Sequence, residues 1–177
     1  MQQPVCILDV RVVSIRSSDT TFLRYAGEQR VGIGSRKVPD QSYKMIPAKQ
    51  AFEMLEGNPS AVLIDVRSDM EYLMVGHPAH AVHIAWIDAP DWTVNPGFVA
   101  EVRKVLLGRA AAHEKNAPVV LLCRSANRSQ DAADVLIAQG FENVYVVEGG
   151  FEGPLDENHH RSKISGWRYE GLPWEQC

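Results

Sequence analysis

The sequence has few cysteines, and the ones it has are not arranged in pairs. Cys6, Cys123 and Cys177 are the only cysteines among the 177 residues, an odd count with no Cys-x-x-Cys spacing. Such a set offers neither a disulfide framework nor a zinc site, and it is typical of a reducing compartment. We therefore expect a cytoplasmic protein.

The sequence also lacks an excess of basic charge and any long apolar run. Its net charge is -4, which argues against a nucleic-acid-binding surface as the main purpose. No apolar run is long enough to span a bilayer, and Met1–Pro4 lacks the start of a secretory signal. The apolar share of 45% and the charged share of 23% are those of a globular domain. We expect neither a nucleic-acid partner nor a membrane partner.

Three regularly spaced histidines, His77, His80 and His83, are the one pattern that suggests a metal site. Pro78 interrupts the helix that would align them, and His83 falls in a predicted strand. We therefore predict no metal site and no other cofactor.

From residue 43 onward, apolar β-branched runs alternate with helical patterns. The predicted strands are 43–46, 61–66, 81–86, 118–122 and 143–147, and residues 90–96 are predicted as loop. The predicted helices are 48–55, 68–74, 98–106 and 130–139. This alternation predicts an α/β domain over residues 43–177, with a mostly parallel central sheet and helices on both faces.

Residues 1–42 do not share this alternation. We interpret them as an N-terminal extension of unassigned structure that packs on the main domain or mediates association. A homodimer therefore stays open.

Cys123 follows a predicted buried strand and precedes a predicted helix. Open α/β sheets bind ligands at this edge, and the free N–H groups and dipole of a helix N-terminus favour a thiolate over a thiol. Ser125 and Ala126 are small enough for the backbone to curl with its N–H groups inward, and Arg124 and Arg128 add positive charge. A buried structural cysteine is the alternative interpretation.

Other polar residues end neighbouring predicted strands at the same edge of the sheet. Asp65, Arg67 and Glu148 are the candidates to support the cysteine. Asp65 could orient an arginine of the loop or cap its N–H groups, or it could be a turn residue after a strand.

Several short motifs occur together in one order. They are Leu63–Arg67, Glu71 followed by Gly76-His77, Cys123–Arg128, and Gly140-Phe141 leading into Val144–Gly150. In this order and spacing the chain resembles a single-domain rhodanese, a sulfurtransferase, from about Tyr43 to Trp174. One departure is visible: Pro78–Ala81 follows Gly76-His77, where the family usually has Ile-Pro-Gly-Ala.

The resemblance implies that Cys123 attacks the outer sulfur of a donor such as thiosulfate and becomes a persulfide. Cyanide or a thiol would then remove that sulfur, in covalent ping-pong catalysis. The substrate-binding loop would comprise Arg124, Ser125, Ala126, Asn127 and Arg128. The acceptor of the sulfur could also be another protein.

Two other functions remain as alternatives. One is a non-catalytic rhodanese-like module for binding or sulfur carriage. The other is a phosphatase or arsenate reductase of the related dual-specificity type, whose cysteine loop is one residue longer. The short spacing from Cys123 to Arg128 favours sulfur over a tetrahedral phosphate.

Overall fold

The computed structural model describes residues 42–108 and 117–176 of the chain. The extension expected over residues 1–42 lies outside the described residues, apart from Ser42. The described residues include almost all of the domain expected over residues 43–177.

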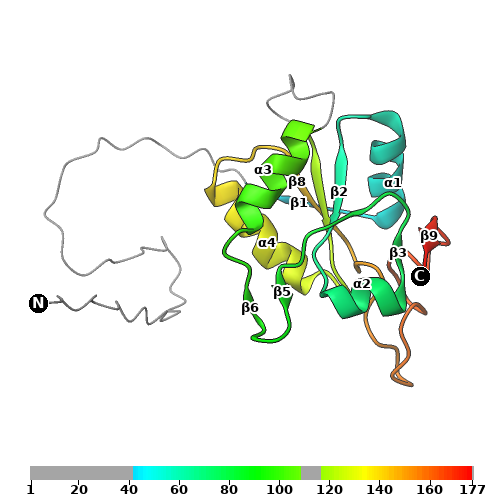
Figure 1. Cartoon of the computed structure of the whole chain (residues 1–177). Coiled ribbons are helices and arrows are strands. Elements are labelled where there is room, and N and C mark those ends of the chain that lie inside the picture. The colour runs from blue at the N-terminus through cyan, green and yellow to red at the C-terminus, as the bar shows by residue number, and fades with distance from the viewer. Residues whose placement is uncertain (1–41, 109–116, 177) are drawn as a thin grey trace, which may run out of the picture. The chain divides into compact units, whose positions relative to one another are not determined.

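A five-stranded parallel sheet forms the centre of the domain (Figure 1). In spatial order the strands are β1 (Lys44–Ile46), β8 (Val144–Val147), β7 (Val119–Leu122), β2 (Val62–Asp65) and β4 (Val82–His83). All residues of β7 and β2 are buried, as expected for strands covered on both faces. The predicted α/β fold with a parallel central sheet is confirmed.

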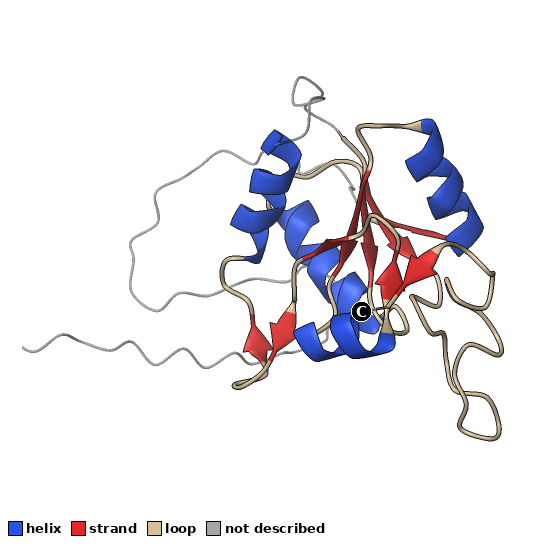
Figure 2. Ribbon diagram, turned by 45° about the vertical axis from the view of Figure 1, so that its right-hand side comes forward, coloured by secondary structure: helices blue, strands red, loops and turns tan. Residues whose placement is uncertain are grey.

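Helices cover both faces of this sheet (Figure 2). On one face lies α1 (Ala48–Gly57), and on the other lie α3 (Phe98–Gly108) and α4 (Asn127–Ala138). Within residues 42–108 and 117–176, no helix combines the length and the apolar character needed to cross a bilayer.

The two faces of the sheet contribute to separate cores because side chains alternate along a strand. Val119 and Leu121 of β7 belong to the core that includes residues of α3 and α4. Val120 and Leu122 belong to the core that includes residues of α1. Trp167, from the segment after β8, packs into this second core and is 1% exposed.

The short helix α2 (Asp69–Val75) begins with a capping box. The hydroxyl oxygen of Ser68 accepts a hydrogen bond from the backbone N–H of Glu71, and the backbone N–H of Ser68 donates to the Glu71 carboxylate. This reciprocal pair fixes the position of the Glu71 carboxylate.

Two short antiparallel pairs complete the described fold. In one, β3 (His77–Pro78) pairs with β9 (Trp174–Glu175), which joins the C-terminal segment to the turn at Gly76. In the other, β5 (Ile87–Asp88) pairs with β6 (Thr93–Val94). The prediction of loop throughout 90–96 is therefore wrong for β6.

The strand predicted over 81–86 is also shorter than expected. It pairs with β2 only at Val82–His83. The backbone N–H of Ile84 still donates to the carbonyl of Asp65 at 3.0 Å. The backbone N–H of Trp86 likewise donates to the carbonyl of Val66 at 3.1 Å, one residue beyond the end of β2.

Candidate active site

Cys123 lies directly after β7, between the ends of β2 and β8. The residue is 1% exposed. Its Sγ is 3.4 Å from the hydroxyl of Ser129, and that hydroxyl is 2.9 Å from the carbonyl oxygen of Ala126. The sulfur therefore has a polar neighbour on the first turn of α4.

The loop after Cys123 is shorter than the sequence predicts. Ala126 takes a left-handed conformation, with φ of 77°, and turns the chain directly into α4 at Asn127. Asn127 and Arg128, which we expected in the loop, therefore belong to the first turn of the helix, and Asn127 is exposed. Arg124 is exposed and Ser125 half-buried.

Arg128 is bound to a carboxylate from α2. Its Nη1 and Nη2 donate to the two carboxylate oxygens of Glu71 at 2.6 and 2.8 Å. Burial raises the pKa of Glu71, but the hydrogen bonds and charge of Arg128, with hydrogen bonds from Ser68, bring it down to about 2. Burial lowers the pKa of Arg128, but the hydrogen bonds and charge of Glu71, together with the carboxylate of Asp65, raise it overall. Both partners of this pair are therefore held in their charged forms.

Arg124 has a different carboxylate partner, from the segment after β8. Its Nε donates to Glu152 at 3.1 Å, and the side chain of Arg124 is 45% exposed whereas that of Glu152 is 11% exposed. The backbone N–H of Glu152 also donates to the carbonyl of Arg124 at 3.0 Å. One face of this guanidinium group therefore stays open to solvent.

Asp65 and Arg67 form a fully buried ion pair beside the cysteine strand. Nε of Arg67 lies 2.9 and 3.0 Å from the two carboxylate oxygens of Asp65, and Nη2 donates to the carbonyl of Gly76 at 2.7 Å. The guanidinium carbon lies 4.3 Å from the ring centroid of Phe151. Asp65 therefore contacts Arg67, which is not an arginine of the loop, and its carboxylate also accepts the backbone N–H of Arg67 at 3.1 Å.

The segment after β8 lies against the cysteine loop through a glycine. Gly150 has φ of 61°, and a Cβ at this position would collide with the carbonyl of Cys123 and the backbone of Arg124. The next residue, Phe151, donates its N–H to that carbonyl of Cys123 at 2.8 Å. Only glycine allows this approach at a positive φ, so the backbone of the cysteine loop is held against the segment that follows β8.

The sequence profile of the rhodanese-like domain family matches residues 47–156, well over half of the chain. The chain belongs to the rhodanese family. Among solved structures, the chain is similar to the crystal structure of Rv0390 from M. tuberculosis. It is 42% identical, covers 77% of this chain and 99% of that one, and has a TM-score of 0.65.

Two curated proteins are also similar in sequence to this rhodanese domain. An uncharacterized protein of Rickettsia conorii, RC0915, is 30% identical over 134 residues, which are 76% of this chain and 98% of the relative. The thiosulfate sulfurtransferase GlpE of Pseudomonas putida is 34% identical over 110 residues, which are 62% of this chain and 83% of GlpE.

Glu148 was expected to support the rhodanese site, but its side chain is exposed and its backbone N–H pairs with Ile46 at 2.9 Å. The carboxylates that contact the loop arginines are Glu71 and Glu152. Glu71 already belonged to a motif in the sequence, without an assigned contact. The positive φ of Gly149 and Gly150 reverses the chain, so that Glu152 and not Glu148 lies at the cysteine loop. Nothing in the sequence distinguishes the two glutamates in advance.

The spaced histidines of this rhodanese domain do not converge on one point. The rings of His77 and His83 stack on the ring of Tyr72, with centroids 3.8 and 4.3 Å away. The described residues include no group of three side chains placed to hold a metal ion.

Proposed function

We propose that this chain is a sulfurtransferase in which Cys123 carries sulfane sulfur as a persulfide. The observation that carries the proposal is the position of this thiol, directly after β7, against the first turn of α4 and beside the Ser129 hydroxyl. The N-terminal end of a helix favours an anionic sulfur. Membership of the rhodanese family and the likeness to a thiosulfate sulfurtransferase support the same chemistry.

The reaction has two steps. The thiolate of Cys123 attacks the outer sulfur of thiosulfate, a sulfur–sulfur bond forms on Cys123, and sulfite leaves with the electron pair of the broken bond. Cyanide or a thiolate then attacks the outer sulfur, and Cys123 leaves as a thiolate. The persulfide places the reactive sulfur about 2 Å beyond Sγ. That extension matters because Cys123 itself is 1% exposed.

The two loop arginines have different roles in this proposal. Both Nη groups of Arg128 are bound by Glu71, so Arg128 orders the loop and contributes positive charge near the sulfur. Arg124 has an exposed guanidinium face, which suits the sulfonate oxygens of thiosulfate.

Mass spectrometry after thiosulfate treatment tests the proposal. We expect the peptide containing Cys123 to gain the mass of one sulfur atom and to lose it on addition of cyanide, with release of thiocyanate. The Cys123→Ser variant, which retains Cys6 and Cys177, is the matched control and should gain nothing.

Three outcomes separate the functions. An unmodified Cys123 would contradict the proposal and favour a binding module. A persulfide that cyanide and thiols do not remove in a catalytic cycle would indicate a sulfur carrier. Turnover of an aryl phosphate that is lost in Cys123→Ser would indicate a phosphatase.

The small, unpaired set of cysteines supports a cytoplasmic setting for this chemistry.

A further inference from the structure

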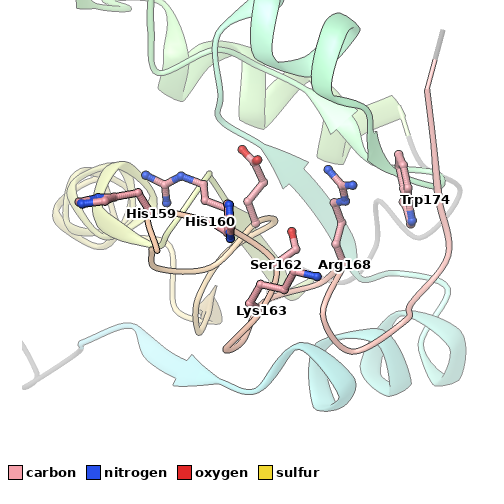
Figure 3. A pocket seen from close by; sticks show the side chains of 8 residues that line it. His159, His160, Ser162, Lys163, Arg168 and Trp174 are labelled. Carbon is pink, nitrogen blue, oxygen red and sulfur yellow. The ribbon is translucent and has the colours of Figure 1, made fainter. Parts of the chain in front are cut away.

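An open pocket of about 760 Å³ lies on the segment that follows β8 (Figure 3). Its lining includes Glu152, Arg161, Lys163 and Arg168, and none of the lining residues belongs to the cysteine loop, 123–128. Pockets that bind organic ligands have volumes of roughly 300–1,000 Å³. The pocket therefore has the size of a ligand site and is separate from the sulfur of the cysteine.

The charge of this pocket is opposite to that of the whole chain. Its three cations, Arg161, Lys163 and Arg168, have no carboxylate partner within residues 42–108 and 117–176. The carboxylate in the lining, that of Glu152, already pairs with Arg124. The chain as a whole carries a net charge of -4. A local excess of positive charge on an acidic protein attracts an anionic ligand.

The two arginines of the pocket are held in place by neutral groups. Nη1 of Arg161 donates to the carbonyl of Gly153 at 2.6 Å, and its buried Nε has no partner among the described residues. Buried polar groups without a partner are rare, and a bound ion or water is one of the usual reasons for them. The guanidinium group of Arg168 lies over the ring of Trp174, 4.5 Å from its centroid (Figure 3). Cations fixed in this way bind an anion at a low entropic cost.

The loop that carries Lys163 has a strained backbone at the pocket. His159 and Ser162, which line the pocket, take left-handed conformations with φ of 60° and 58°. Such conformations are uncommon for residues other than glycine, and they cluster at segments that bind ligands. The backbone N–H of Ser162 donates to the carbonyl of Glu152 at 2.6 Å, which fixes the loop at the pocket. Lys163 is therefore presented by an ordered segment.

We propose that this pocket binds a compact oxyanionic ligand with about three negative charges, such as a diphosphate or a tricarboxylate. Three cations without carboxylate partners match a trianion, whereas a dianion leaves one of them uncompensated. Two of the three are arginines, whose planar forks donate paired hydrogen bonds to phosphate and carboxylate groups. The volume leaves room for an organic group attached to the anion. The ligand takes no part in the sulfur transfer proposed for Cys123.

Lys163→Glu is the sharpest variant, because Lys163 is exposed and makes no hydrogen bond or ion pair with the described part of the chain. Lys104→Glu makes the same charge change on α3, where Lys104 is also exposed, and serves as the matched control. Calorimetry in a buffer without phosphate would measure the binding of pyrophosphate, citrate and the dianion sulfate. We expect pyrophosphate or citrate to bind more tightly than sulfate, and Lys163→Glu to weaken that binding about fivefold. Lys104→Glu should bind like the wild type.

The same measurements identify the recognised group. Tighter binding of pyrophosphate than of citrate indicates a phosphate ligand, and the reverse order indicates a carboxylate ligand. Cys123→Ser should bind the preferred anion as tightly as the wild type, so the inference is tested whether or not the protein transfers sulfur.

Four results would overturn the inference. They are no binding of pyrophosphate or citrate, binding of sulfate as tight as that of both, an equal loss in Lys104→Glu, and binding of only an acidic peptide such as hexaglutamate.

Discussion

The two ion pairs on either side of Cys123 use the same chemical groups and differ in exposure. Asp65–Arg67 lies at the end of β2 and has both side chains fully buried, whereas Arg124 pairs with Glu152, after β8, and is 45% exposed. A buried pair cannot exchange its carboxylate for a substrate, because that would leave a charge unpaired in a medium of low dielectric constant. An exposed pair can exchange partners at little cost. Exposure therefore separates a structural arginine from one available to bind an anion.

Arg128–Glu71 lies between these extremes, with side chains 23% and 20% exposed. Its two short hydrogen bonds use both Nη groups, so by geometry it belongs with the buried pair. Variants of the three pairs should therefore follow the order of their burial.

The largest loss of stability is expected at the buried pair. Asp65→Asn removes the negative charge and leaves Arg67, which is 0% exposed, without a charged partner. Breaking such a pair costs about 3–5 kcal/mol, which urea unfolding would measure. The double variant Asp65→Leu, Arg67→Met removes both charges and should recover most of that loss. A loss below about 1 kcal/mol in Asp65→Asn would show that burial does not distinguish the pairs.

Glu71→Gln should have the next largest effect, and that effect should depend on pH. The pKa of Glu71 is lowered from 4.5 to about 2 in the folded protein, so the unfolded chain takes up the proton first on acidification. The stabilisation of about 3 kcal/mol is complete above pH 4.5 and is lost as the pH falls toward 2.

Urea unfolding at pH 7, 4 and 3 would measure this difference between the wild type and Glu71→Gln. The two should differ most at pH 7 and converge as the pH falls. A constant difference across this range would mean that ionisation of Glu71 is not what stabilises the pair.

The sequence predicts what depends on local pattern. The apolar run of β7, the position of Cys123 after it and the alternation of strands and helices all follow from neighbouring residues. The start of α4 was placed three residues too late, because the pattern does not show that Ala126 takes a left-handed conformation.

The partners of the loop arginines could not be predicted in the same way. Glu71 is 57 residues from Arg128 in the sequence, and only the packing of α2 beside α4 brings them together. Likewise Glu152, rather than Glu148, reaches Arg124 because two glycines with positive φ reverse the chain between them. Such pairings depend on backbone geometry, for which residue type is a weak guide.

The smallest loss of stability and the clearest loss of binding are expected together in Arg124→Gln. The exposed pair with Glu152 contributes less than about 1 kcal/mol to folding, so urea unfolding should change little. A charge-assisted hydrogen bond to the donor is worth about 1.5 kcal/mol, so the KM for thiosulfate should rise about tenfold. Glu152→Gln is the matched control, because it breaks the same pair and leaves the guanidinium group free. The KM should not rise in that variant, and a rise equal to that of Arg124→Gln would mean that the ion pair, and not the open face of Arg124, supports donor use.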